Sequence, residues 1–304
     1  MNTVRQSKSD DSVVVVGGSG AVGRLIVDLM RGDGVPVTVV DVHESSDAAS
    51  PVTVGNIIAP DDRLTSVLTR AATVILAVPE SVALAADLSA VQPEALVVET
   101  LSVKSGFARH VDATDRLGPT VGINPMFAPS LGMAGRPVAA VVHREGPSAD
   151  AFLDRVARWG GRVVLLDAAR HDRLAAATQA LTHASVLAFG LALAELDLPF
   201  GDIAAVAPPP HATMLAVLAR ITGGEPEVYW DVQAGNPHAA EARAALRRAT
   251  QTLNEAVDSG SETQFARLLT EAESALGGSG DHYRAVCAEM FGIVRGSSRT
   301  DDRW

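Results

Sequence analysis

Cysteine is nearly absent from the sequence, with Cys287 alone among 304 residues. One thiol forms neither a disulfide within the chain nor a cysteine-rich zinc site, so a disulfide-stapled secreted scaffold is excluded and a reducing compartment is favoured. The first twelve residues also lack the apolar segment of a secretory signal. We therefore expect a cytoplasmic protein that is not exported.

Basic residues are in the minority. Lysine and arginine number 25 against 36 aspartates and glutamates, which gives a formal net charge of -11 at pH 7. Nucleic acid phosphates and anionic lipids repel a chain of this charge. We therefore expect neither nucleic acid nor a membrane among its partners.

Long hydrophobic runs are missing as well. The most apolar stretch with helical character, Leu181–Leu198, is interrupted by Thr182, His183, Ser185, Glu195 and Asp197. These interruptions make a membrane span unfavourable. The stretch is predicted to be a buried helix.

The chain is long enough for two domains, and the first shows an alternating pattern. Short β-branched runs alternate with helical stretches up to about residue 145, as in a parallel sheet with crossover helices. A helix that ends at Gly160-Gly161 and a strand at Val163–Leu166 complete this half. The other expected strands are Val13–Val16, Val37–Val42, Thr73–Val78, Leu96–Leu101, Thr120–Ile123 and Val138–Val142, and the expected helices include Ala21–Arg31, Asp61–Arg70 and Val82–Leu88.

Beyond about Arg170 the β-type runs disappear. The remaining sequence is rich in Ala, Leu and Arg, which is typical of an all-α domain. One helix is expected to begin at Ser261, because Ser261 and Gln264 match a capping box. The predicted division is a first domain at 1–168, a helical domain at 169–295 and a flexible tail at 296–304.

A glycine-rich loop follows the first expected strand. Gly18, Gly20 and Gly23 have the G-x-G-x-x-G spacing, with Ala21 and Val22 at the start of the next helix. Such a loop permits a tight turn and presents backbone N–H groups and the helix dipole to a pyrophosphate. The pattern predicts a Rossmann-type dinucleotide-binding domain within an α/β fold. A glycine turn with a purely structural role is the alternative.

Two strand ends add to this prediction. The second expected strand ends at Asp41, whose carboxylate suits the ribose hydroxyls of an adenosine and repels a 2′-phosphate. NAD is therefore favoured over NADP, and a solvated strand-end carboxylate is the alternative. Val78 and Pro79 end the third expected strand at the edge where open α/β folds bind ligands, or they form an ordinary strand terminus.

Three further segments narrow the function. They are Leu101–Gly106 (LSVKSG), Gly122–Pro129 (GINPMFAP), and His171-Asp172 followed by Gln179–His183 (QALTH). Together with the glycine loop, these segments resemble the prephenate dehydrogenase family over most of the chain. The resemblance implies an NAD-dependent enzyme that oxidatively decarboxylates a cyclohexadiene to an aromatic pyruvate. It also implies a helical domain that forms the homodimer, and an active site between the two domains.

The resemblance assigns roles to individual residues. Ser102 matches a serine near the nicotinamide, and His183 matches a histidine of the substrate pocket. Gln179 lies four residues before His183, so both side chains are expected on one helical face. Arg220 matches the arginine that holds a substrate carboxylate, and Tyr229 belongs to the aromatic pair that follows it. The alternatives are a helix that packs polar groups against the other domain and a solvated arginine.

One position departs from the family pattern. Prephenate dehydrogenases have a histidine in the segment G-x-H-P-M-F, and this chain has Asn124 there. An amide does not titrate near neutral pH and cannot act as a general base. In 4-amino-4-deoxyprephenate, an amine replaces the ring hydroxyl and its lone pair assists hydride departure, so a base becomes dispensable. We therefore expect this substrate, with Asn124 and Ser102 as catalytic residues and no metal ion.

Two other functions remain open at this point. The first is dehydrogenation of ordinary prephenate or arogenate in tyrosine synthesis, and the second is an inactive NAD-binding regulator. The resemblance implies that family members acting on the amino substrate make 4-aminophenylpyruvate for antibiotics. His171 and Lys104 also fit the family pattern, but the sequence leaves their roles open.

Overall fold

The computed structural model describes residues 12–44, 51–114 and 118–295, and the predicted tail at 296–304 lies outside them. The chain divides into two compact units between Ala175 and Ala176, whereas the sequence predicted a boundary after residue 168. Helix α6, Ala168–Ala175, belongs to the first unit. It does so because its His171 and Asp172 are buried there, as described below.

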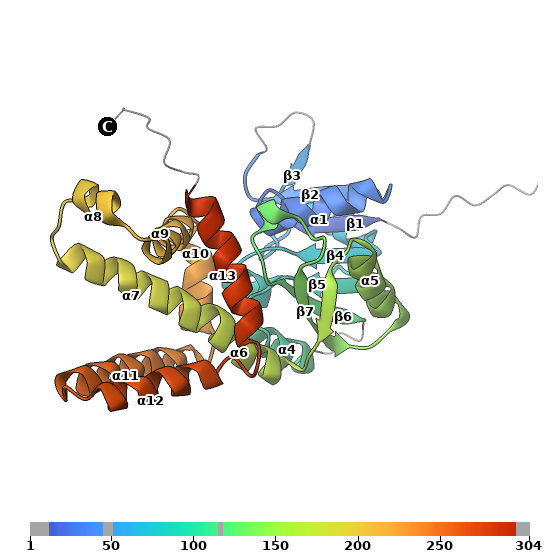
Figure 1. Ribbon diagram of the computed structural model, residues 1–304. Coiled ribbons are helices and arrows are strands. Elements are labelled where there is room, and N and C mark those ends of the chain that lie inside the picture. Colours follow the sequence, from blue (N-terminus) through green and yellow to red (C-terminus); the bar gives the residue numbers. More distant parts are fainter. Residues whose placement is uncertain (1–11, 45–50, 115–117, 296–304) are drawn as a thin grey trace, which may run out of the picture. The chain divides into compact units, whose positions relative to one another are not determined.

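The first unit contains one eight-stranded sheet in the order β3-β2-β1-β4-β5-β6-β7-β8 (Figure 1). Neighbouring strands are parallel except β6 and β7. The carboxyl ends of β1, β2, β4, β5 and β6 therefore meet at one edge, where Rossmann-type folds bind their ligands. The strands are β1 (Val13–Val16), β2 (Val37–Asp41), β3 (Val52–Val54), β4 (Thr73–Leu76), β5 (Leu96–Glu99), β6 (Thr120–Pro125), β7 (Pro137–Arg144) and β8 (Arg162–Leu165).

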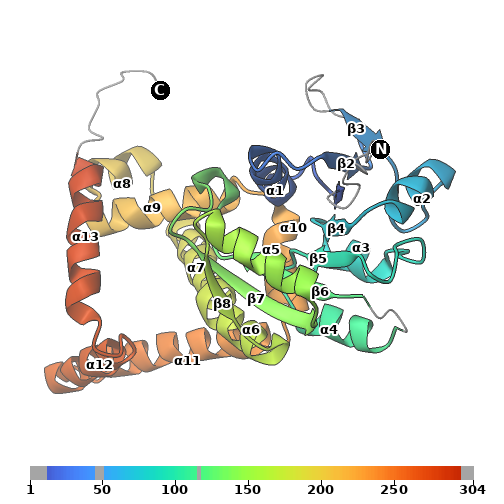
Figure 2. The same ribbon diagram turned by 90° about the vertical axis from the view of Figure 1, so that its right-hand side faces the viewer.

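Helices cover both faces of this sheet (Figure 2). Val13 and Val15 of β1 belong to one core cluster, and Val14 and Val16 belong to the other, because successive side chains of a strand alternate between faces. The valine run is thus buried on both sides, as expected of a central parallel strand. The first cluster includes α1 (Ala21–Gly32) and α5 (Pro147–Arg158), and the second includes α2 (Asp62–Thr69), α3 (Glu80–Ala85) and α4 (Ser105–Asp112).

The predicted α/β fold class is confirmed, with local differences. The sequence did not predict β3, because an edge strand of three residues is too short to show a period. The helix expected at Val82–Leu88 instead follows Pro79 and ends at Ala85. Pro79 is the extended N-cap residue of that helix, and Ala86 is again extended.

The described residues of the second unit form helices joined by turns and loops, with no strand among them, as predicted. Helix α12 begins where the sequence placed it, and the Ser261 hydroxyl accepts the backbone N–H of Gln264 at 3.3 Å. The reciprocal half of the capping box is absent, because Gln264 Oε1 accepts a bond from Ser259. The elements are the π-helical turn η2 (Ala176–Ala180), α7 (Leu181–Glu195), α8 (Phe200–Val206), α9 (Pro209–Thr222), α10 (Pro226–Trp230), the π-helical turn η3 (Asp231–Gly235), α11 (Ala239–Asp258), α12 (Glu262–Ser274) and α13 (Gly280–Arg295).

The prediction of a buried helix at Leu181–Leu198 was wrong. Val186 is the one buried residue of α7, and Leu191 is 74% exposed. Among the described residues, the helical stretch Ala168–Glu195 is long and apolar enough to cross a membrane by length and composition alone, and 22% of its most apolar window is buried. The helix is apolar on all sides, but the chain supplies neighbours for only part of its surface.

A buried ion pair lies at the carboxyl edge of the sheet. Glu99 ends β5, and its Oε2 lies 2.7 Å from Lys104 Nζ, with neither side chain exposed. Lys104 also donates to the carbonyl of Ile123 at 3.0 Å, and His143 Nε2 lies 2.9 Å from Glu99 Oε1. Burial opposes charge on Glu99, yet Lys104 and His143 together hold the pKa of its carboxyl below the ordinary value. The pair joins β5, β6 and β7 close to the segment that contains Ser102.

Gly122 of β6 makes room for this pair. A Cβ at Gly122 would overlap Glu99 Oε1 and would come within 2.9 Å of His143 Nε2. A residue with a side chain at this position would therefore displace the carboxylate from its partners.

We expect Lys104→Met to lower the free energy of unfolding by about 3–5 kcal/mol, because it leaves Glu99 buried without its cationic partner. Urea denaturation measures this change. The control is Arg284→Met, which removes exposed contacts with Asp281 and Glu273 and should have little effect. Similar losses in both variants would contradict the assigned role of the buried pair.

The same pair gives a pH dependence with a definite sign. The folded-state pKa of Glu99 is depressed, so its contribution to stability is present at neutral pH and is lost only as pH falls below about 4.5.

Candidate active site

The glycine loop folds back on the first turn of α1. Gly17 has φ of 75°, a left-handed conformation that favours glycine. A Cβ at Gly23 would overlap the carbonyl oxygen of Gly17, and a Cβ at Gly18 would lie 2.7 Å from Val39. Gly20 is the N-cap residue of α1, and the first turn of that helix has no side-chain cap and no acidic residue. Its backbone N–H groups, including those of Ala21 and Val22, are thus suited to an anion.

Asp41 lies beside this loop. It ends β2, and its Oδ2 accepts the backbone N–H of Ser19 at 3.1 Å. Its Oδ1 accepts the N–H groups of Val42 at 2.8 Å and His43 at 3.4 Å. The half-exposed carboxylate is therefore oriented next to the glycine turn, where the predicted ribose acceptor is needed. These residues fit an adenosine pyrophosphate.

Val78 and Pro79 follow β4 at the same edge. A Cβ at Gly17 would lie 2.9 Å from Val78 Cγ1, so this valine borders the glycine turn directly. Pro79 is the N-cap residue of α3. Ser102 is half-buried in the segment between β5 and α4, again after the carboxyl end of a parallel strand. The predicted cofactor residues of the first unit thus share one edge of the sheet with Ser102.

Asn124 is near the end of β6 at this edge and is 3% exposed. Its Nδ2 lies 3.2 Å from His171 Nε2, and His171 Nδ1 lies 2.9 Å from Asp172 Oδ1. The structure thereby links Asn124 to the His171-Asp172 pair, which the sequence had left without a role.

Asp172 is the anchor of this group. Its carboxylate accepts the backbone N–H groups of Lys104 at 2.8 Å and Ser105 at 2.9 Å, at the start of α4. Burial alone would raise the pKa of Asp172, but the hydrogen bonds from His171, Ser105 and Lys104 outweigh burial and hold the pKa below the ordinary value. The side chain is therefore an ionised carboxylate at neutral pH.

Three of the predicted substrate residues lie close together in the second unit. The rings of His183 and Tyr229 meet edge to face with centroids 4.9 Å apart. Burial, and then the nearby positive charge of Arg220, lower the pKa of His183, so its imidazole is neutral at pH 7. Arg220 is exposed, and no described acidic residue forms an ion pair with it.

Gln179 precedes His183 by one turn, within η2. The buried atoms Gln179 Oε1 and His183 Nδ1 have no hydrogen-bond partner among the described residues. Unpartnered buried polar atoms are costly in a protein interior, and they are typical of a site that a polar ligand completes.

The two π-helical turns are held together. Gln233 of η3 donates its amide to the carbonyl of Ala180, the last residue of η2, at 2.8 Å. Arg243 then donates to the backbone carbonyl of Gln233 at 2.7 Å and to its side-chain oxygen at 2.9 Å. The second turn directly follows Tyr229-Trp230, so these bonds connect the helix of Gln179 and His183 to the segment after Tyr229. π-Helical turns are frequent at functional sites.

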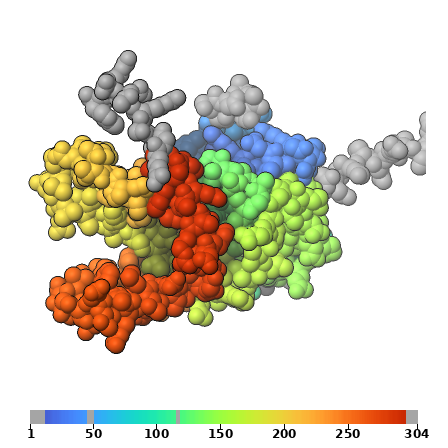
Figure 3. Space-filling view, in the orientation of Figure 1, coloured from blue at the N-terminus to red at the C-terminus, as the bar shows by residue number. Residues whose placement is uncertain are grey.

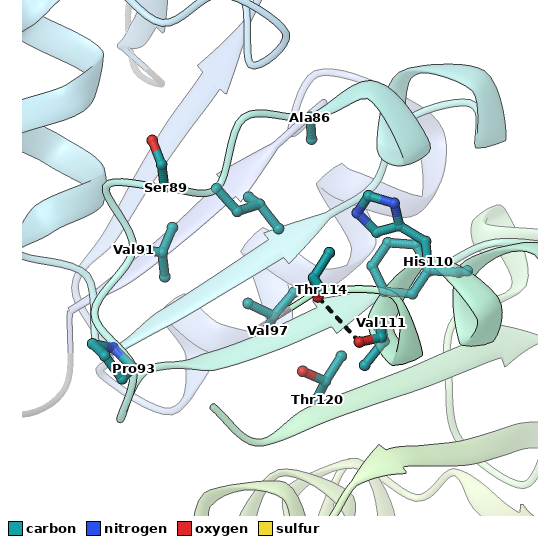
Figure 4. Close-up of a pocket in the computed structure, with 11 residues that line it drawn as sticks. Ala86, Ser89, Val91, Pro93, Val97, His110, Val111, Thr114 and Thr120 are labelled. Atoms are coloured by element: carbon teal, nitrogen blue, oxygen red, sulfur yellow. Dashed lines mark hydrogen bonds between the residues drawn. The ribbon is translucent and has the colours of Figure 1, made fainter. Parts of the chain in front are cut away.

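A separate cavity of about 460 Å³ lies at the opposite edge of the first unit's sheet (Figure 4). It lies at the amino ends of β5 and β6, and Val97, Phe107 and Thr120 line it. Most of its wall is apolar, and His110 is its one titratable lining residue. This cavity is therefore separate from the predicted dinucleotide site at the carboxyl ends of the strands.

Sequence reasoning missed Glu99 and His143. Glu99 had a usable signal, since it is a charged residue at the end of an apolar strand and lies three residues before Ser102. His143 had none, because its contact with Glu99 depends on the pairing of β7 with β6.

Comparison with known proteins supports these assignments of fold and family. Residues 167–271 match the family model described as prephenate dehydrogenase, dimerization domain. The chain is 49% identical over 282 residues to the 4-amino-4-deoxyprephenate dehydrogenase of Streptomyces pristinaespiralis, covering 91% of this chain and 95% of that protein. It is 28% identical to the T-protein of Enterobacter agglomerans, covering 94% of this chain and 72% of that protein.

Solved structures agree on the fold. The crystal structure of prephenate dehydrogenase from Aquifex aeolicus superposes with a TM-score of 0.68 at 16% identity, covering 88% of this chain and 98% of that one. A structure of the enzyme from A. aeolicus in complex with hydroxyphenyl propionate and NAD+ gives a TM-score of 0.66 at 18% identity, covering 89% and 98%. Near-full-length identity of 49% establishes the family, and the chain is a dehydrogenase that belongs to the prephenate dehydrogenase family.

Proposed function

We propose that the enzyme oxidatively decarboxylates 4-amino-4-deoxyprephenate to 4-aminophenylpyruvate, a precursor for antibiotics of the 4-aminophenylalanine type, in the cytoplasm. The observation that carries the proposal is Asn124, a buried amide at the end of β6 where the family pattern has a histidine. The name of the Streptomyces relative supports the same substrate.

The chemistry of the ring explains why an amide suffices. Hydride departure from the amine-bearing carbon leaves positive charge that the nitrogen lone pair takes up as an iminium. Loss of the ring carboxylate as CO₂ then returns an electron pair to the ring and restores a neutral aromatic amine. Once the substrate is bound as the neutral amine, no further proton has to leave the nitrogen during hydride transfer, so no general base is needed at that step. With a ring hydroxyl the same charge makes the O–H strongly acidic, and a base assists.

NAD is the cofactor of this proposal, and when bound it accepts the hydride. The glycine loop and the N-terminus of α1 would hold its pyrophosphate, and Asp41 would accept the ribose hydroxyls. Ser102 follows β5, and Asn124 lies near the end of the neighbouring strand β6. Both would therefore orient the reacting ring carbon at the carboxyl edge of the sheet, where the dinucleotide is proposed to bind. The proposed substrate-binding residues of the second unit are Arg220, Tyr229, His183 and Gln179, with Arg220 as the group for a carboxylate.

Ala in place of Gly23 should weaken NAD binding sharply, because the new Cβ overlaps Gly17 O and forces the loop away from α1. Gly32→Ala is the matched control, since nothing lies within 4 Å of a Cβ there. Calorimetric titration with NAD and NADP measures both effects. Equal NAD affinity in the two variants, or tighter NADP binding by the wild type, would overturn the cofactor assignment.

We expect Arg220→Ala to raise the KM of the ring substrate by roughly tenfold or more and to leave NAD affinity unchanged, because a lost charge-assisted contact costs about 2 kcal/mol. Arg247→Ala on α11 is the control for a solvated helix arginine. Steady-state kinetics at saturating NAD decide the matter, and an unchanged KM would make Arg220 a surface residue.

The substrate proposal is tested by kcat/KM for 4-amino-4-deoxyprephenate and prephenate in the wild type and in Asn124→His. The wild type should prefer the amine. The variant should shift toward prephenate, since general-base assistance is typically worth about 100- to 10,000-fold and an imidazole supplies it. A wild type that prefers prephenate would instead support the alternative function, dehydrogenation of prephenate or arogenate in tyrosine synthesis.

We also propose that the second unit forms a homodimer. Exposed apolar side chains occur on several of its helices, including Leu191 on α7 and Ile293 on α13, which are 74% and 78% exposed. Figure 3 shows the outer surface of α13 in red. The matched family model is described as a dimerization domain. Faces of this kind are typical of surfaces that a second subunit covers.

Light scattering at micromolar concentration should give twice the chain mass of 31.5 kDa. Leu191→Glu should shift the protein toward the monomer by placing a charge within the apolar face. The control is Arg247→Glu, which introduces the same glutamate at an exposed position that already carries a charged side chain. A wild-type monomer at this concentration would refute the dimer.

A further inference from the structure

An ordered chain of hydrogen bonds ends on the amide of Asn124. Asp172 accepts backbone N–H groups from Lys104 and Ser105, and its Oδ1 lies 2.9 Å from His171 Nδ1. His171 Nε2 then lies 3.2 Å from Asn124 Nδ2. The residues Asp172, His171 and Asn124 are 0%, 1% and 3% exposed, so water does not compete for these bonds.

The direction of each bond follows from the atoms that meet. An ionised carboxylate only accepts, so His171 Nδ1 carries the hydrogen that points at Asp172. At the other ring nitrogen, the structure places the amide nitrogen of Asn124 3.2 Å from His171 Nε2. An amide nitrogen only donates, so Nε2 is the acceptor of this bond. The orientation of the Asn124 amide and the Nδ1–H tautomer of His171 therefore imply each other.

The amide oxygen is then left for a different partner. Among the described residues, the one hydrogen bond of the Asn124 side chain is that between its Nδ2 and His171 Nε2. Rotation of the amide by half a turn would exchange its oxygen and nitrogen, and His171 opposes that rotation.

We propose that His171 and Asp172 are positioning residues that hold Asn124 with its oxygen as the acceptor for the ring amine of the substrate. The chemical class of that ligand rests on the proposed function. An N–H bond to this oxygen strengthens as positive charge develops on the nitrogen, so it stabilises the transition state more than the ground state. With the amide reversed, N–H groups would face a nitrogen that is becoming positive, and the oxidation would slow.

A double-mutant cycle between His171 and Asn124 tests the proposal. The variants are His171→Ala, Asn124→Ala and the combination, each assayed with saturating NAD and whichever ring substrate the wild type oxidises faster. His171→Ala should lower kcat by about 10- to 100-fold, the usual effect of removing a group that orients a functional residue, with the NAD affinity unchanged. In the Asn124→Ala background the same change should have almost no further effect. Equal losses in both backgrounds would overturn the proposal.

Two further variants separate orientation from folding. His171→Gln keeps an acceptor that can reach Asn124 Nδ2 and should recover part of the activity that His171→Ala loses. His143→Gln removes another buried histidine, 1% exposed and hydrogen-bonded to a carboxylate, but one that does not touch Asn124. It should lower thermal stability and leave kcat nearly unchanged. A loss of kcat equal to that of His171→Ala would mean that both histidines act through the fold.

A third test uses the wild type alone and does not depend on the activity of any variant. Nitrogen-15 NMR of histidine-labelled protein at pH 7.5 should show His171 as the neutral Nδ1–H tautomer. An Nε2–H tautomer or an imidazolium would refute the proposal. The substrate preference of the wild type is measured separately, so a failed substrate assignment leaves the cycle and the tautomer interpretable.

Discussion

The first unit depends on one constraint, the burial of an ion pair away from water. Glu99 and Lys104 are both fully buried, and each must find partners at its charged atoms or destabilise the fold by several kcal/mol. Their partners lie on the segments that carry the site: the carbonyl of Ile123, beside Asn124, and the N–H of Leu101, beside Ser102. Meeting the needs of one ion pair therefore fixes the ends of β5 and β6 relative to each other. The backbone of Lys104 extends the arrangement to Asp172, and through it to His171.

Repeating patterns explain what could be predicted from the sequence. The run Val13–Val16 followed by closely spaced glycines predicts a central strand and a dinucleotide turn. Both predictions rest on local sterics, because the turn leaves no room for a Cβ at several of its glycines. Ser261 likewise indicates a helix start from chemistry within one turn. The Asn124–His171 contact had no such signal, since it joins positions 47 residues apart and depends on the packing of α6. The exposure of α7 escaped prediction for a related reason, because an apolar sequence does not say whether its neighbours lie in the same chain.

The groups assigned to chemistry are held in two different ways. In the first unit they lie at strand ends, where the sheet spacing and the buried charges fix them. In the second unit they lie on helices whose regular hydrogen bonding is interrupted twice, at η2 and η3. Gln233 and Arg243 supply the bonds that connect these interruptions, so they support Gln179 and His183 without being predicted substrate residues.

The π-helical turn at Ala176–Ala180 also limits how the chain tolerates insertions and deletions. The hydrogen bonds of a π-turn join residues i and i+5, so the turn contains one residue more than a turn of α-helix, whose bonds join i and i+4. Removal of one residue from this turn would therefore convert it to regular α-helix and change the carbonyl that Gln233 meets at Ala180, even though every remaining side chain stayed the same. Length in this short turn is thus as much a part of the enzyme's specification as composition.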